Sequence, residues 1–334
     1  MILVTGGTGF VGAHLLYHLT LENNAITAIY RSEHTFDEVQ KVFSYYTENY
    51  ILLFNKIQWV LADITDINSL KTVFSVNFKY VYHCAALVSF NPRDYHKMKL
   101  VNIEGTANII NFSITNTVEK VCFVSSIAAV GESSNNQLIN EENEWTHSND
   151  KHGYAITKNG AEMEVWRGSQ EGIDVVIVNP GVILGSGFYK HASGKLFSQV
   201  YNGLKFYTDG STGFIGVKDV VKSMLFLMNS EIKNQRYILV SENKSFKEIF
   251  DQIAITFNKK KPSIKIGRIA TSIVWRIDWI LTKLTGKEPL LTKSSARAAH
   301  NKESYSTTKI TAVLDFNFEK INTVIKEVCA NYKR

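Results

Sequence analysis

MILVTGGTGFVGAHLLYHLT, residues 1–20, is the stretch that decides the fold we expect for the chain. The run from Ile2 to Val4 is short and apolar, as in a buried strand, and the stretch from Ala13 to Leu19 has the apolar face of a helix. Three glycines separate them at a spacing of three residues: Gly6, Gly9 and Gly12. A strand, a glycine turn and a helix in this order predict a site for the phosphates of a dinucleotide.

The phosphates would lie at the N-terminus of the helix, where the backbone N–H groups have no acceptor within the helix. The amides of Phe10, Val11 and Gly12 are the candidates for this contact. A tight turn that binds nothing is the other interpretation, but the flanking strand and helix favour the dinucleotide.

Further apolar runs recur along the chain with helix-like spacers between them. They cover residues 25–30, 57–61, 80–84, 120–124, 174–178 and 237–240. Strands that alternate with helices predict a Rossmann-like, doubly wound parallel sheet of the α/β class. We expect residues 1–180 to form the dinucleotide-binding domain, joined by a returning strand near 236–241. Residues 181–334 would form most of a smaller, interleaved C-terminal substrate-binding lobe.

The composition excludes some classes of function. The net charge is +6, and the basic residues lack the aromatic neighbours or the module of a nucleic-acid site. Cys84, Cys122 and Cys329 form no C-x-x-C pair, so we expect neither a zinc site nor a redox centre. The chain enters its first strand without a signal peptide, and we therefore expect a cytoplasmic protein.

One long apolar stretch raises the question of a membrane: residues 266–284, IGRIATSIVWRIDWILTKL. Four charged residues interrupt it: Arg268, Arg276, Asp278 and Lys283. These charges argue against a membrane-spanning segment. The pattern fits an amphipathic helix that covers a cleft or lies on a membrane surface, and we favour the cleft. For Trp275 and Trp279 on this helix we expect core packing.

Residues after the second and third strands indicate how the adenosine end of the dinucleotide would be held. Arg31 stands where many NAD enzymes have an acid for the ribose 2′-hydroxyl, which favours the 2′-phosphate of NADP. A solvated arginine is the plain alternative, and Glu33 nearby keeps NAD open. Asp63 and Ile64 would contact the adenine, although Asp63 is as well suited to cap a helix.

Small and polar residues follow the fourth strand. Ala85 and Ala86 would let a flat cofactor lie against the chain, or they are simply packed at a strand–helix junction. Asn102 would steady a bound water or a helix kink, and a helix-surface asparagine is the alternative.

The strongest catalytic pattern is the pair Ser125-Ser126 at the end of the fifth strand, followed by Tyr154-Ala-Ile-Thr-Lys158. Residues four apart share a helix face, so Tyr154 and Lys158 would point into one cleft. A nearby ammonium would lower the phenol pKa, and the phenol would then exchange a proton with a carbonyl oxygen. A serine at the carboxyl end of a strand would hold that same oxygen.

Histidines and tryptophans near these motifs give weaker signals. His14 and His18 have the spacing of a metal-binding pair, but no third ligand is visible, so we expect both on the helix surface. Trp145, His147 and His152 lie between the serine and tyrosine motifs, in a loop that would border the substrate.

In this order the motifs resemble an extended short-chain dehydrogenase/reductase of the NAD-dependent epimerase/dehydratase superfamily. TGGTGFVG, LADITD, HCAA, VN-x-x-GT, VSSIAAVG, YAITK, VNPGVILGSG and FIGVKDV occur in the family's order within the first two thirds of the chain. The chain is most similar to the branch of dihydroflavonol reductase, cinnamoyl-CoA reductase and 3β-hydroxysteroid dehydrogenase.

The resemblance implies roles for individual residues. Tyr154 would be the catalytic acid/base, and Lys158 would hold the nicotinamide ribose and tune the tyrosine. Ser126, with Ser125 as the alternative, would contact the reacting oxygen. The nicotinamide end would be lined by Pro180, Gly181 and Val182. A homodimer is also implied, in which the helix that carries Tyr154 and the helix before it pair with their copies.

Departures from the family pattern narrow the range of reactions that we expect. Sugar-nucleotide epimerases usually have Arg-Pro and then Tyr-Gly in the proline turn, whereas this chain has Asn179-Pro180 and then Leu184-Gly185. We therefore favour NADP-dependent reduction of a small-molecule aldehyde or ketone, or the reverse oxidation of an alcohol. NAD-dependent epimerisation of a sugar nucleotide and a regulator that binds NADP without turnover are the alternatives.

Overall fold

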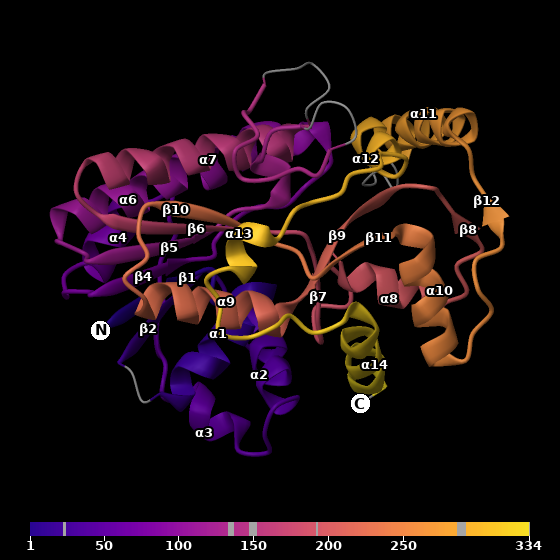
Figure 1. Ribbon diagram of the computed structural model, residues 1–334. Helices are drawn as coiled ribbons and strands as arrows, with labels where there is room; N and C mark the ends of the chain where they lie inside the picture. The colour runs from indigo at the N-terminus through magenta and orange to yellow at the C-terminus, as the bar shows by residue number, and fades with distance from the viewer. Residues whose placement is uncertain (23–24, 133–136, 147–151, 192, 286–291, 334) are drawn as a thin grey trace.

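The computed structural model describes residues 1–22, 25–132, 137–146, 152–191, 193–285 and 292–333, with backbone alone at residues 280, 281, 283 and 284. A large sheet with helices on both faces lies beside a smaller C-terminal lobe (Figure 1). Within the described ranges, no helix combines the length and apolarity needed to cross a bilayer.

The large sheet is entirely parallel. It contains β1 (Ile2–Thr5), β2 (Ile26–Tyr30), β3 (Gln58–Leu61), β4 (Tyr80–His83), β5 (Lys120–Val124), β6 (Asp174–Pro180) and β10 (Gln235–Leu239). The strand order is β10-β6-β5-β4-β1-β2-β3, with parallel pairing between all neighbours. The order reverses between β1 and β4, and in such sheets ligands bind beyond the carboxyl ends of the strands at that point.

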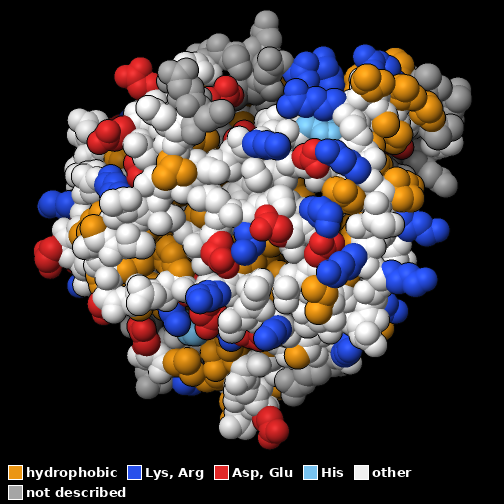
Figure 2. Space-filling view, turned by 45° about the vertical axis from the view of Figure 1, so that its right-hand side comes forward, with side chains coloured by type: hydrophobic (Ala, Val, Ile, Leu, Met, Phe, Trp, Pro, Cys, Tyr) orange, Lys and Arg blue, Asp and Glu red, His pale blue; other side chains and the backbone are white. Residues whose placement is uncertain are grey.

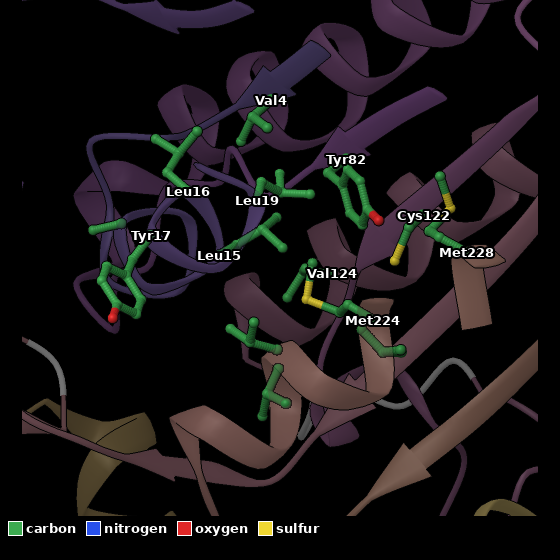
Figure 3. Close-up of a cluster of buried hydrophobic side chains, with 14 of the residues drawn as sticks. Val4, Leu15, Leu16, Tyr17, Leu19, Tyr82, Cys122, Val124, Met224 and Met228 are labelled. Carbon is green, nitrogen blue, oxygen red and sulfur yellow. The ribbon is translucent and has the colours of Figure 1, made fainter. Parts of the chain in front are cut away.

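Helices cover the sheet on both faces because its strands are apolar on both sides. One face carries α1 (Phe10–Leu21), α2 (Phe36–Ser44), α3 (Tyr50–Phe54) and α9 (Val217–Asn229). Figure 3 shows part of the core on this side, with labelled side chains from β1, β4, β5, α1 and α9: Val4, Tyr82, Cys122, Leu15 and Met224 among others. This packing fixes the start of α1 beside the end of β1.

The opposite face carries α4 (Ile67–Val73), α6 (Gly105–Thr115) and α7 (Gly153–Gln170). A short α5 (Tyr95–Met98) continues into a π-helical turn, η3 (Lys99–Glu104), which leads into α6. Figure 1 shows α6 and α7 side by side above the sheet. The N-terminal end of α7 therefore lies next to the π-helical turn and the end of β5.

The smaller lobe has its own sheet and core. Its strands are β7 (Val182–Leu184), β9 (Ser211–Gly216) and β11 (Glu242–Ser245), in the order β11-β9-β7. Apolar side chains of α8 (Gly194–Tyr201), α10 (Phe246–Phe257) and α14 (Ile321–Tyr332) pack against this sheet. The remaining elements are β8 (Phe206–Tyr207), β12 (Ile264–Lys265), α11 (Arg268–Thr285), α12 (Lys293–Ala298) and α13 (Thr308–Thr311).

The fold class expected from the sequence is confirmed, and each expected strand of the large sheet is present within two residues of its expected bounds. Both α9 and β10 follow residue 181 in the chain, yet α9 covers the large sheet and β10 pairs with β6. The sequence did not indicate the three-stranded sheet of the lobe, whose strands are short and contain several polar residues.

Candidate active site

Six neighbouring strands place the predicted site residues along one edge of the sheet. From β6 through β5, β4, β1 and β2 to β3, the strand ends carry Pro180, Ser125-Ser126, Ala85-Ala86, Gly6, Arg31 and Asp63. Neighbouring strands are about 4.8 Å apart, so the row from β5 to β3 is roughly 19 Å long. Such a row suits an elongated ligand with one end near the serines and the other near Asp63.

The glycine turn after β1 is shaped by two close approaches. Gly6 has φ +68°, and a Cβ there would lie 2.5 Å from the backbone nitrogen of Ala85. A Cβ at Gly12 would collide with the backbone of Gly6. The nearest neighbour of a Cβ at Gly9 is the Gly6 carbonyl oxygen at 3.2 Å, a far milder contact. Internal packing therefore explains Gly6 and Gly12, whereas Gly9 keeps the turn free of a side chain where a ligand would approach.

The first turn of α1 offers backbone N–H groups to an anion. Gly9 is the N-cap and provides no side-chain acceptor, and the first turn contains no acid. The N–H of Ala13 donates to the Gly9 carbonyl at 2.8 Å, so the amides of Phe10, Val11 and Gly12 precede this bond. An uncapped helix start of this kind fits the pyrophosphate of a dinucleotide.

Arg31 and Asp63 lie side by side at the other end of the row. The Arg31 Nη1 atom is 3.8 Å from Asp63 Oδ2, and both side chains are exposed to solvent. Asp66 is the N-cap of α4, whereas Asp63 accepts the N–H of Thr65 at 2.9 Å. The helix-capping interpretation of Asp63 is therefore wrong, and its second carboxylate oxygen faces the guanidinium.

Three further residues predicted to contact the cofactor, Ala85, Ala86 and Ile64, differ in how far their side chains are exposed. Ala85 and Ala86 are partly exposed, and the Ala85 N–H donates to Thr5 Oγ1 at 3.3 Å. Ile64 is buried, and a Cβ at Gly105 would collide with its side chain. The Ile64 side chain thus has little surface to offer to an adenine.

Asn102 joins the loop after β4 to the helix that carries the tyrosine motif. Its Oδ1 accepts the Leu87 N–H at 2.7 Å, and its Nδ2 donates to the Leu87 carbonyl and to Thr157 Oγ1, each at 3.0 Å. Asn102 is buried within the π-helical turn. The helix-surface interpretation is therefore wrong, and the side chain lies at a helix irregularity, as the kink interpretation expects.

A buried histidine that the sequence did not single out connects the same elements. The Nδ1 atom of His83 lies 2.5 Å from Thr5 Oγ1, and its Nε2 atom lies 2.9 Å from Thr106 Oγ1. Thr106 donates its own proton to the Asn102 carbonyl, so His83 Nε2 carries the hydrogen and Nδ1 accepts from Thr5. Burial lowers the pKa of His83 to about 3, which keeps this ring neutral. This network fixes the ends of β1 and β4 relative to η3.

The two serines after β5 point to different partners. Ser125 is buried and donates to Glu162 Oε1 at 2.5 Å. Ser126 is partly exposed and accepts the N–H of Ala128 at 3.1 Å, and its side chain lies close enough to the Tyr154 phenol to lower the phenol pKa. The structure therefore places Ser126, not Ser125, beside the phenol.

The surroundings of Tyr154 are apolar and aromatic. Its ring is stacked with that of His152 at 6.1 Å between centroids, and the ring of Phe90 lies 6.4 Å away. Burial raises the pKa of Tyr154 to about 12, although the nearby Ser126 side chain acts in the opposite direction. The expectation of a lowered phenol pKa is therefore wrong for this structure, and the phenol is protonated at neutral pH. Of the loop residues expected near the substrate, His152 lies at this site and His147 lies outside the described residues.

Lys158 is buried one turn after Tyr154. Its Nζ donates to the Val124 carbonyl at 2.7 Å and lies 4.7 Å from the centroid of the Phe123 ring. Burial lowers the pKa of Lys158 to about 8, with the Glu162 carboxylate acting in the opposite direction. The ammonium is thus fixed at the end of β5 by the backbone and exists at neutral pH.

A buried carboxylate lies one further turn along the same helix face. Glu162 accepts from Ser125 and, at 2.6 Å, from Asn179 Nδ2, and Arg236 Nη1 lies 3.5 Å from its second oxygen. Burial raises the pKa of Glu162, and these three partners offset part of the rise. Asn179 also donates to the Ser126 carbonyl at 2.9 Å. The hydrogen bonds and the ion pair around Glu162 thus connect β5, β6, α7 and β10 next to Ser126. The spacing of four from Lys158 could have indicated it in the sequence.

The proline turn passes from the large sheet to the lobe. Pro180 is buried at the end of β6, and Val182 begins β7 with its side chain partly exposed. A Cβ at Gly181 would collide with the backbone of Gly213 in β9, so the turn packs tightly against the lobe sheet. Pro180 and Val182 therefore lie at the β6 end of the row of site residues, next to the end of β5.

The histidine pair on α1 is not a surface feature. His14 is buried, its Nε2 donates to the Ser186 carbonyl at 3.0 Å, and its Nδ1 accepts from the Tyr46 hydroxyl at 2.6 Å. His18 is partly buried in the same aromatic group. The surface expectation is therefore wrong for His14. No cluster of three or more potential metal ligands occurs among the described residues.

Comparisons with known proteins point to one family. A model of the NAD dependent epimerase/dehydratase family matches residues 2–240. A putative dihydroflavonol 4-reductase of Synechocystis sp. is 25% identical over 313 residues, 92% of this chain and 87% of the relative. The anthocyanidin reductase of Arabidopsis thaliana is 28% identical over 272 residues, 74% of this chain and 78% of the relative. The solved structure of a Thermotoga maritima UDP-glucose 4-epimerase with UDP-glucose has a TM-score of 0.77 at 17% identity, covering 99% of this chain and 98% of that one. This last similarity concerns the fold.

Proposed function

The chain belongs to the NAD-dependent epimerase/dehydratase family, and from that premise we propose that it is an NADP-dependent reductase of an aldehyde or ketone, or the dehydrogenase of the reverse reaction. The placement of Ser126 beside the Tyr154 phenol, with Lys158 buried one turn further along α7, carries the proposal. The names of the two relatives, both reductases, support reduction over epimerisation.

Each of the three side chains has a separate task in this reaction. A bound nicotinamide supplies or accepts the hydride. The Tyr154 phenol donates its proton to the substrate carbonyl oxygen as that oxygen gains negative charge. Ser126 holds the same oxygen through its hydroxyl. Lys158 holds the ribose and stabilises the phenolate that Tyr154 becomes, because an adjacent positive charge favours the anion.

The proposed preference for NADP rests on Arg31. Its guanidinium is exposed at the end of β2 and lies only loosely against Asp63 at 3.8 Å. Glu33, which kept NAD as an alternative, lies 3.4 Å from the Tyr30 hydroxyl as its hydrogen-bond acceptor. An arginine in this position binds a 2′-phosphate through charge and a planar set of donors.

The substrate that we propose is apolar or aromatic. Phe90 is an exposed aromatic side chain next to Tyr154, and together with His152 it forms an aromatic wall beside the phenol. The names of the two reductase relatives, a dihydroflavonol 4-reductase and an anthocyanidin reductase, favour a panel that includes aromatic ketones. The homodimer, the cytoplasmic location and the division near residue 180 stay predictions.

A panel of aldehydes and ketones, offered with NADPH and with NADH, tests the proposed function. The absorbance of the reduced nicotinamide should fall with at least one aromatic or apolar carbonyl, and faster with NADPH. Reduced cofactor that stays unconsumed while a nucleotide sugar is converted to its epimer would support the epimerase instead.

A further inference from the structure

Helix α11 differs from an ordinary surface helix in which side chains it buries and which it exposes. Two of its three threonines, Thr271 and Thr282, are buried, and Thr271 Oγ1 lies 2.9 Å from His300 Nε2. Five of its large apolar side chains are exposed: Ile269 at 81%, Ile273 at 54%, Val274 at 47%, Ile277 at 52% and Trp279 at 51%. We call these five residues the α11 face. A surface helix normally buries its apolar side chains.

The three isoleucines of the α11 face form a stripe. At about 100° per residue, Ile269, Ile273 and Ile277 lie within an arc of roughly 80°. Thr271 and Thr282 lie on the opposite side of the helix by the same count. Trp275 lies beneath Arg276, whose guanidinium is 4.8 Å from the indole centroid. The expectation of core packing is therefore wrong for Trp279, and the exposed isoleucines face solvent.

The positive charge of the chain is concentrated in the segment of sequence that contains this helix. Residues 259–300 contain ten Lys and Arg but two Asp and Glu, whereas the rest of the chain contains 27 Lys and Arg and 29 Asp and Glu. Lys259, Lys260, Lys261 and Lys293 in this segment are exposed. Figure 2 shows the apolar side chains of this corner next to a group of Lys and Arg side chains. The segment thus joins exposed apolar side chains to a local positive charge.

We propose that the α11 face and exposed basic residues of the same segment lie on the surface of a membrane that contains anionic phospholipid. Apolar and tryptophan side chains enter the boundary between headgroups and acyl chains, while lysine and arginine side chains meet lipid phosphates. The helix lies in the plane of the membrane and does not cross it. A second copy of the chain is a poor occupant, because two such faces would bring like charges together.

Vesicle sedimentation of the full chain tests the proposal. The protein should sediment with vesicles of phosphatidylcholine and phosphatidylglycerol and remain in solution with vesicles of phosphatidylcholine alone. The substitution Ile273→Asp should weaken this binding at least ~10-fold, because it places a charge in the apolar stripe. The matched control is Ile255→Asp on α10, since Ile255 is equally exposed at 54%. That variant should bind as the wild type does.

Further measurements show where the face lies and remove folding as an explanation. Tryptophan emission should shift to shorter wavelength on the anionic vesicles, and Trp279→Phe should reduce that shift. Circular dichroism should show both aspartate variants folded as the wild type. Equal binding by wild type and Ile273→Asp, or no preference for the anionic vesicles, would overturn the proposal. The proposal would also be overturned if the wild-type protein formed oligomers and bound no vesicles, and if Ile273→Asp converted those oligomers to monomers. A second copy of the chain would then occupy the α11 face.

Discussion

Ser126 lies beside the phenol of Tyr154, whereas its neighbour Ser125 points into the protein and donates to the buried carboxylate of Glu162. Two adjacent serines of the same type thus lie in different environments. One shares a partly exposed site with the candidate acid, and the other satisfies a buried charge.

This difference predicts opposite effects for two alanine variants. Ser126→Ala should lower kcat/KM by roughly 100-fold or more, because it removes a donor to the reacting oxygen. Ser125→Ala should keep most of the activity but lose about 1–3 kcal/mol of stability, since Glu162 loses a buried partner. Steady-state kinetics and urea unfolding measure the two effects. A larger loss of rate in Ser125→Ala would reverse the assignment.

Arg31 provides a test of the cofactor preference. Arg31→Ala should raise the KM for NADPH about 10-fold or more and leave the KM for NADH nearly unchanged, because only NADPH carries the 2′-phosphate. Arg93→Ala, which removes an exposed arginine after β4, is the control and should change neither value. Equal effects of Arg31→Ala on both cofactors would contradict the NADP assignment.

Lys158 predicts a loss of cofactor affinity at alkaline pH. Burial lowers its pKa to about 8, so the ammonium is present below that pH and disappears as pH rises through it. The dissociation constant for NADPH should therefore increase between pH 7 and pH 9, by up to about tenfold for each pH unit above the pKa. Lys158→Met should bind weakly and without this pH dependence. An unchanged profile in that variant would assign the titration to another group.

The buried histidines predict instability in acid. Burial lowers the pKa values of His14 and His83 to about 3, below the ordinary value of 6.5. Their contribution to stability is therefore complete above pH 6.5 and is lost as pH falls toward 3, because the unfolded chain binds the protons first. Each histidine should lower the free energy of unfolding by about 1.4 kcal/mol for each pH unit that the pH falls within this range. Urea unfolding at pH 7 and pH 5 should show a smaller pH effect in His14→Gln, and an unchanged effect would contradict this cause.

Local patterns were sufficient to predict the large sheet and the position of the candidate site residues at the ends of its strands. The glycine spacing from Gly6 to Gly12 and the Tyr154–Lys158 spacing lie within single turns or helices, so no distant contact is needed to interpret them. The alternation of strands and helices then places the strand ends at one edge.

Other features depend on contacts between distant parts of the chain. His14 is buried because Tyr46 and Ser186 pack against it from other elements, and nothing in the α1 sequence indicates those partners. Glu162 could have been noticed from its spacing of four from Lys158, but Arg236 is 74 residues further along the chain. The raised pKa of Tyr154 also results from tertiary burial rather than from its neighbour on the helix.

The central claim, that Tyr154 donates the proton in a carbonyl reduction, is tested most directly by Tyr154→Phe. The variant keeps the ring and loses the hydroxyl, so turnover should fall at least ~100-fold, while the dissociation constant for NADPH stays within about twofold. Tyr95→Phe, on the short helix α5 beside the start of α7, should keep the wild-type rate. Near wild-type turnover by Tyr154→Phe on a carbonyl substrate of the wild-type protein would contradict the account.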